Sequence, residues 1–116
     1  MKLKQNLETF LVKDPNFLLQ TSVFLAMFIH LNIKVFGRVQ GVLFRQSTAY
    51  KAEELGITGF VRNDYDGSVY LEVEGKRDIL DKFVVWCRRG PSFAKVTKVE
   101  VVESSLQKFS GFVIEG

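Results

Sequence analysis

Cysteine and histidine are nearly absent from this sequence, which contains only Cys87 and His30. A single cysteine excludes an intrachain disulfide and is typical of proteins of the reducing cytoplasm, where we expect this chain to reside. The ligand spacing of a zinc site is also missing, and a Cys–His or Ser–His catalytic pair would have to use His30. We expect Cys87 to be a buried structural thiol and His30 to lie on the surface of a strand.

A broad cationic face is also absent. The 16 lysines and arginines are interleaved with 13 aspartates and glutamates, and the net charge is +3. This pattern is typical of a solvated surface, so we expect no nucleic-acid partner. At 116 residues, 47% hydrophobic and 25% charged, the chain is typical of one soluble domain, and we expect a monomer. Turn and strand positions favour exposed solubilising charges over a metal site at Asp64, Asp66, Glu72 and Glu74.

The sequence has no long uninterrupted hydrophobic run. Residues 17–31 are mostly apolar, but Gln20, Thr21 and Ser22 interrupt them, so we expect no membrane span. A signal peptide, a start upstream of a natural Met27, and an amphipathic extension are each consistent with residues 1–26, although no small-residue cleavage site follows them. We favour a partly helical extension of uncertain origin outside the core, and we assign residues 27–116 to one domain.

Hydrophobic periodicity predicts the elements that follow. Alternating apolar residues indicate strands over residues 29–35, 57–62, 68–74, 94–102 and 109–114, with Gly75 ending the third of these segments. Apolar residues at helical spacing indicate helices over residues 44–55 and 79–87. This order predicts an α+β fold, a ferredoxin-like β-α-β-β-α-β sandwich with an antiparallel sheet, two helices on one face and an additional terminal strand.

Two glycines and an arginine mark the junction between the first strand and the first helix. Gly37 and Gly41 allow positive φ angles and close approach of a ligand to the backbone. Arg45 stands where the helix begins, and a helix N-terminus offers unpaired N–H groups and partial positive charge. An arginine fork beside such amides suits phosphate oxygens, so the segment predicts a site for a small phosphate-bearing ligand.

Connectivity brings a second polar residue toward this loop. The first two strands are joined by a helix crossover and can run parallel, which would place Arg45 near Asn63 at the end of the second strand. Arg45 could bind phosphate bidentately, and the Asn63 amide could hold a water in position. Neither side chain is a good general base at neutral pH. Any reaction at this site therefore needs a substrate whose electrophilic group is already activated.

Both segments resemble motifs of one family. Residues 37–45, GRVQGVLFR, are similar to the signature loop of the acylphosphatases, and residues 59–63, GFVRN, resemble the family's Gly-aromatic-Val-basic-Asn pattern. Further matches at the family's spacing are Gly67, Val69, Gly75, Gly90, Pro91, Ala94 and Val96. The resemblance covers residues 28–116, and two independent motifs in the right order make it specific.

The resemblance implies hydrolysis of the carboxyl–phosphate bond of small acyl phosphates, with no metal, no cofactor and no covalent intermediate. It implies that Arg45 binds the phosphate together with loop amides and that Asn63 orients the attacking water. The loop residues implied in substrate binding are Arg38, Val39, Gln40, Gly41, Val42, Leu43 and Phe44. The alternative is a non-catalytic regulatory domain that binds a small anion in the same loop.

Overall fold

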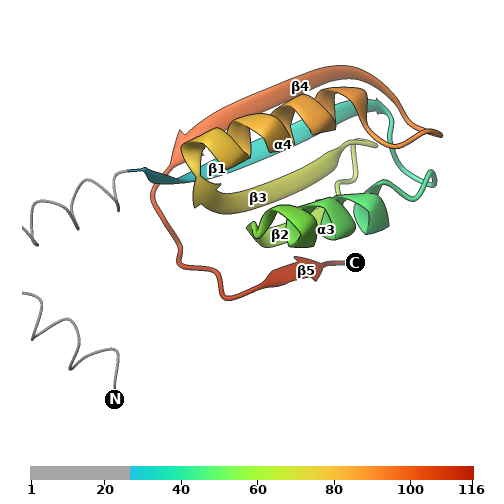
Figure 1. Cartoon of the computed structure of the whole chain (residues 1–116). Coiled ribbons are helices and arrows are strands. Elements are labelled where there is room, and N and C mark those ends of the chain that lie inside the picture. Colours follow the sequence, from blue (N-terminus) through green and yellow to red (C-terminus); the bar gives the residue numbers. More distant parts are fainter. Residues whose placement is uncertain (1–26) are drawn as a thin grey trace, which may run out of the picture.

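The computed structural model describes residues 27–116, in which two helices lie against one face of a five-stranded sheet (Figure 1). The extension expected over residues 1–26 lies outside the described residues. The elements in chain order are β1 (Phe28–Arg38), α3 (Phe44–Leu55), β2 (Thr58–Asn63), β3 (Val69–Lys76), α4 (Arg77–Arg89), β4 (Lys95–Ser104) and β5 (Phe112–Ile114).

The strands are ordered β4-β1-β3-β2-β5 across the sheet. β1 pairs antiparallel with both β3 and β4, and β2 pairs antiparallel with β3, so the predicted ferredoxin-like α+β fold is confirmed. The sheet is nevertheless mixed rather than purely antiparallel, because β5 pairs parallel with the outer edge of β2. β5 arrives there from β4, at the opposite edge of the sheet, through residues 105–111, which we call the connector.

Several element boundaries differ from those predicted. Gly75 does not end β3, because it pairs with Ile29 of β1 and the strand continues to Lys76. The helix α4 then begins directly at Arg77. β4 runs to Ser104, and β5 begins only at Phe112, because residues 109–111 of the predicted last strand belong to the connector.

The core lies between the sheet and the two helices. Each strand sends alternate side chains to this layer, as the period-two pattern predicted. The fully buried side chains from the strands include Ile33, Val35, Val61, Val69, Leu71 and Val73, and those from the helices are Phe44, Thr48, Ala52, Leu80, Phe83 and Cys87. The prediction that Cys87 is a buried thiol is confirmed, and burial raises its pKa.

The other face of the sheet carries a buried polar cluster that was not predicted. His30 has no exposed surface, and its Nδ1 lies 2.7 Å from Oε2 of Glu74. Its Nε2 lies 2.9 Å from both Oε1 of Glu72 and Oδ1 of Asn32. The predictions that His30 and Glu74 are exposed are therefore wrong. The physical reason is that Phe109 of the connector packs against the His30 ring and covers this part of the sheet.

Gly37 makes its close approach to a strand, not to a ligand. It lies at a β-bulge between β1 and β4, with φ at +126°. A Cβ at this position would lie 2.1 Å from the carbonyl oxygen of Lys95. The first glycine of the signature therefore allows β4 to pair with the end of β1, immediately before the loop.

We expect Gly37→Ala to destabilise the fold by about 3 kcal/mol or more, because the new methyl group overlaps backbone that cannot move without breaking the strand pair. Gly67→Ala is the matched control. Gly67 also has a positive φ, +89°, but no atom lies within 4 Å of an added Cβ, so it should lose only about 1 kcal/mol through backbone strain. Urea unfolding of both variants measures the difference, and equal losses would contradict the steric explanation.

Candidate active site

A cavity of about 350 Å³ lies where the loop after β1, the first turn of α3, the end of β2 and the residues around β5 meet. Its lining residues are Val39, Gly41, Leu43, Phe44, Arg45, Gln46, Asn63, Ile114 and Gly116. Arg45 is the one titratable side chain among these described residues. Among the described lining residues, Arg45 therefore supplies the only side-chain charge, and its positive sign suits a small anion.

The start of α3 supplies donors to this cavity. Its N-cap residue, Leu43, has a left-handed backbone with φ at 63° and makes no side-chain capping bond to the helix. The first-turn residues Phe44, Arg45 and Gln46 all line the cavity, and N–H groups at this position in a helix have no partner within the helix. No acidic residue stands in this turn. The helix end is thus left positive and uncapped on the cavity side.

The chain's last residues hold Arg45 in place. Nη1 of Arg45 donates hydrogen bonds to the carbonyl oxygen of Glu115, at 3.0 Å, and to the main-chain oxygen of Gly116, at 3.1 Å. A guanidinium has five N–H groups, and these two bonds use the pair on Nη1. Within residues 27–116, Nε and Nη2 make no hydrogen bond. The edge formed by Nε and Nη2, which can bind two oxygens of one phosphate, is left available.

Asn63 contributes an acceptor without a partner. It is the last residue of β2, and its register partner across the hairpin is Val69 of β3. Its Oδ1 is buried and has no hydrogen-bond partner among the described residues. A buried amide oxygen of this kind is costly unless water or a ligand satisfies it. Asn63 and Arg45 line the same cavity.

The topology explains why these two residues meet. β1 and β2 are not neighbours, but both pair antiparallel with β3, which lies between them. They therefore run parallel to each other, as the helix crossover suggested, and their carboxyl ends lie at the same end of the sheet. The loop that leads to Arg45 follows the carboxyl end of β1, and Asn63 is the last residue of β2.

The seven loop residues implied in substrate binding have different positions. Val39, Gly41, Leu43 and Phe44 line the cavity, whereas Arg38, Gln40 and Val42 do not. Arg38 is the exposed last residue of β1 and pairs with Lys95, and Val42 is buried in the core. Gln40 faces the hairpin between β2 and β3: its Nε2 donates to the carbonyl oxygens of Asp64 and Ser68, both at 2.8 Å.

The contribution of the last residues of the chain was missed by sequence reasoning. Ile114 and Gly116 line the cavity, and the carbonyls of Glu115 and Gly116 orient Arg45. No signal for this was available, because a main-chain carbonyl acts through position and not through residue type. The three-residue β5 also depends for its place on pairing with β2.

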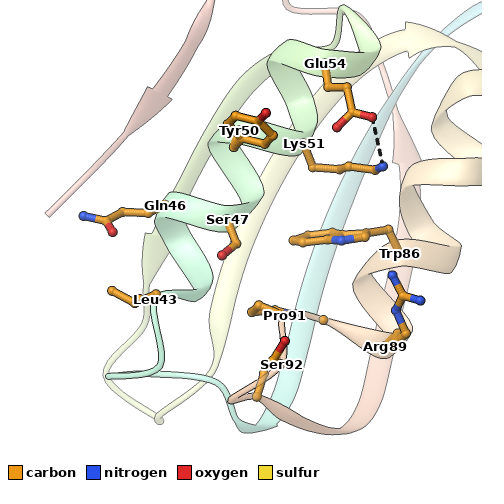
Figure 2. A pocket seen from close by; sticks show the side chains of 12 residues that line it. Leu43, Gln46, Ser47, Tyr50, Lys51, Glu54, Trp86, Arg89, Pro91 and Ser92 are labelled. Carbon is orange, nitrogen blue, oxygen red and sulfur yellow. Dashed lines mark hydrogen bonds and ion pairs between the residues drawn. The ribbon is translucent and has the colours of Figure 1, made fainter.

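A larger groove of about 950 Å³ lies beside the cavity, between α3 and α4 (Figure 2). Figure 2 shows Ser47 of α3 directed toward Trp86 of α4, with the ion pair between Lys51 and Glu54, at 3.4 Å, at one end. Leu43 and Gln46 line both the groove and the cavity, but neither Arg45 nor Asn63 lines the groove. The groove therefore lacks the two residues to which the sequence assigned the chemistry.

No group of three or more histidine, cysteine, aspartate or glutamate side chains within residues 27–116 is placed to hold a metal ion. No helix of these residues has the length and apolar character that crossing a membrane requires.

Comparison with known proteins gives concordant findings. The sequence model of the family described as acylphosphatase matches residues 31–114. An acylphosphatase of Methylococcus capsulatus is 48% identical over 84 residues, which cover 72% of this chain and 91% of that protein. The solved structure of an acylphosphatase from Coxiella burnetii has a TM-score of 0.75 and 37% identity, covering 78% of this chain and 95% of that chain. The acylphosphatase structure from Bacillus subtilis has a TM-score of 0.74 and 38% identity, covering 76% and 99%.

The position of Gln40 predicts a structural effect of its replacement. Gln40→Leu removes both hydrogen bonds to the hairpin and should lower the free energy of unfolding by about 1–3 kcal/mol. Gln46→Leu, on the exposed side of α3, is the control and should change it by less than about 0.5 kcal/mol. Urea titration followed by circular dichroism measures both. If the two variants had the same stability, the loop would not depend on Gln40 for its attachment to the hairpin.

Proposed function

Because the chain belongs to the acylphosphatase family and functions as an acylphosphatase, we propose that Arg45 binds the phosphate of the substrate and Asn63 orients the attacking water. The observation that carries this proposal is that Asn63, whose buried Oδ1 has no hydrogen-bond partner among the described residues, lines the same cavity as Arg45. The family membership confirms the predicted hydrolase. The alternative of a non-catalytic regulatory domain is therefore set aside.

Binding follows from the donors around the cavity. Two phosphate oxygens accept hydrogen bonds from Nε and Nη2 of Arg45, and the first-turn amides of α3 surround the remaining oxygens. The carbonyls of Glu115 and Gly116 keep the guanidinium plane fixed while this happens. Since these groups are already in place before the substrate binds, little reorganisation is needed as charge develops on the phosphate.

The reaction is a displacement at phosphorus. Oδ1 of Asn63 accepts a hydrogen bond from a water molecule and holds the water oxygen toward the phosphorus atom. The new bond forms between that oxygen and phosphorus, and the bond from phosphorus to the acyl oxygen breaks. The electron pair of that bond leaves with the carboxylate, and the proton of the water passes to an oxygen of the phosphate itself. The products are a carboxylate and inorganic phosphate.

This mechanism asks for neither a general base nor a general acid. Within the described cavity lining, Arg45 is the only side chain that titrates, and a guanidinium is a poor proton acceptor at neutral pH. A carboxylate leaves without protonation, so positioning and charge neutralisation are sufficient for an acyl phosphate. We therefore propose that the chain acts on small acyl phosphates without metal or cofactor.

We extend the proposal to the setting of the enzyme. Residues 27–116 form the catalytic domain, which acts as a monomer on a small-molecule substrate. A reducing cytoplasm is consistent with the single cysteine, Cys87, which is free and buried.

Substrate choice tests the proposed chemistry. Purified protein should release phosphate from acetyl phosphate in excess EDTA as fast as without it. Its kcat/KM for a simple alkyl phosphate should be lower by orders of magnitude, because an alcohol leaves poorly without the acid that this cavity lacks. Phosphate release measured with both substrates checks this expectation. Activity that is lost in EDTA and restored by Mg²⁺ would contradict the metal-free mechanism, and similar kcat/KM values would contradict the role of the leaving group.

The two residues should fail in different ways. Arg45→Lys keeps a charge but loses the fork, so it should raise the inhibition constant of inorganic phosphate and lower kcat/KM together. Asn63→Ala leaves the phosphate donors intact, so phosphate inhibition should stay near wild type. Its kcat should fall by about a hundredfold or more, because the water is no longer oriented.

Arg89→Lys provides the matched control for the arginine substitution. Arg89 lines the separate groove between the helices, so both constants should stay at wild-type values in this variant. Circular dichroism verifies the folding of all three variants. If Asn63→Ala weakened phosphate inhibition and kept a normal kcat, Asn63 would be a binding residue and the assignment of roles would be reversed.

A further inference from the structure

The connector has limited freedom. It joins strands at opposite edges of the sheet, so it must cross the distance of four inter-strand spacings, about 19 Å. Eight peptide steps from Ser104 to Phe112 span at most about 28 Å when fully extended. Figure 1 shows the connector running from the end of β4 to β5 on the far edge. Because the connector has little excess length, the point at which it is attached to the sheet limits where β5 can lie.

Glu74 is the side chain that holds the connector. Its Oε1 accepts a hydrogen bond from the backbone N–H of Phe109 at 3.1 Å, and its Oε2 accepts one from the N–H of Gln107. The carboxylate lies on β3, in the middle of the sheet, and is only 6% exposed. The Phe109 ring adds contacts with His30 of β1 and Phe60 of β2. The midpoint of the connector is therefore attached to all three central strands.

The Gln107 amide, together with His30 and the Phe109 amide, favours the charged form of this carboxylate. Burial raises the pKa of Glu74, but the Gln107 amide, His30 and the Phe109 amide outweigh it and hold the pKa below its ordinary value. Burial lowers the pKa of His30, but its bonds to Glu74, Asn32 and Glu72 outweigh it and raise the pKa. Since both ring nitrogens face oxygen atoms, only the doubly protonated imidazolium can donate on both sides. An ionised Glu74 accepts its bonds more strongly than a neutral acid.

The far end of the connector leads directly to the arginine. The N–H of Gly59 bonds to the carbonyl of Gly111, at 2.8 Å, where β5 is about to begin on the edge of β2. After β5, the N–H of Glu115 bonds to the carbonyl of Val61, also at 2.8 Å. The carbonyls of Glu115 and Gly116 then accept the bonds from Nη1 of Arg45. A short three-residue strand thus places the groups that orient Arg45.

We propose that Glu74 is a positioning residue for catalysis: by fixing the connector on the sheet, it holds β5 and the carbonyls of Glu115 and Gly116 in the place that orients Arg45. The inference rests on the proposed phosphate-binding role of Arg45. Loss of the attachment lowers the fraction of molecules in which the guanidinium is ready to bind. Apparent affinity falls in proportion to that fraction, while turnover of bound substrate changes less.

Glu74→Gln tests the proposal, because an uncharged amide cannot accept all the bonds made by the carboxylate. If about one molecule in ten keeps Arg45 oriented, the inhibition constant of inorganic phosphate and the KM for acetyl phosphate should both rise about tenfold. The change in kcat should be smaller. Glu72→Gln is the matched control. Glu72 also contacts His30, and it accepts a bond from the Tyr70 hydroxyl, but it makes no hydrogen bond to the connector. Both constants should stay within about twofold of wild type in this variant.

Deletion of residues 115–116 separates positioning from general destabilisation. The deletion should itself raise the phosphate inhibition constant. If Glu74 acts through these residues, adding Glu74→Gln to the deletion should produce little further rise, because coupled changes are not additive. Full additivity, or an equal effect of Glu72→Gln and Glu74→Gln, would overturn the proposal.

A second variant keeps the test decisive if Glu74→Gln does not fold. Phe109→Ala loosens the connector from the opposite side and leaves the carboxylate unchanged, so it should also raise the phosphate inhibition constant, and an unchanged constant would overturn the proposal. Arg45→Lys distinguishes the two levels of inference. If it leaves phosphate inhibition unchanged, the proposed role of Arg45 fails. If it raises the inhibition constant while Glu74→Gln and Phe109→Ala do not, only the positioning role of Glu74 fails.

Discussion

The antiparallel pairing of β1 and β2 with the same central strand, β3, is the constraint on which the site depends. Two strands that pair antiparallel with a third must run parallel to each other, and so their carboxyl ends lie at the same end of the sheet. The loop leading to Arg45 leaves one of these ends, and Asn63 stands at the other. The cavity arises from this coincidence of ends. Arg45 and Asn63, which stand at the two ends of the α3–β2 segment, therefore line one cavity.

The local parts of this arrangement could be predicted from sequence because their causes are local. The glycine-containing loop, the start of the helix at Phe44 and the hairpin around Gly67 each depend on residues close in the chain. The expectation that Arg45 and Asn63 lie close together followed from the β-α-β connectivity. The role of Gly37 was assigned to the wrong neighbour, since its space is taken by β4, whose residues lie more than fifty positions later.

Prediction failed where burial depends on distant segments. His30 and Glu74 alternate with apolar neighbours, so their pattern is that of an exposed strand face. They are buried because the connector crosses above them, and no pattern within β1 or β3 reports that crossing. The same reason hid the contribution of Glu115 and Gly116 to the site. In each case the missing information was the path of a later segment, and not the character of the residue itself.

The two cationic side chains that matter most to this domain, His30 and Arg45, have different surroundings. On the face of the sheet that carries no helix, the imidazolium of His30 lies between the carboxylates of Glu72 and Glu74, which compensate the burial of its charge. In the cavity, Arg45 donates to two main-chain oxygens, those of Glu115 and Gly116, and to no acidic side chain within residues 27–116. These main-chain oxygens fix the guanidinium through Nη1 and leave its Nε–Nη2 edge without a hydrogen bond among the described residues. They can do so only after the sheet is complete, because the bond from Arg45 to Glu115 joins residues 70 positions apart.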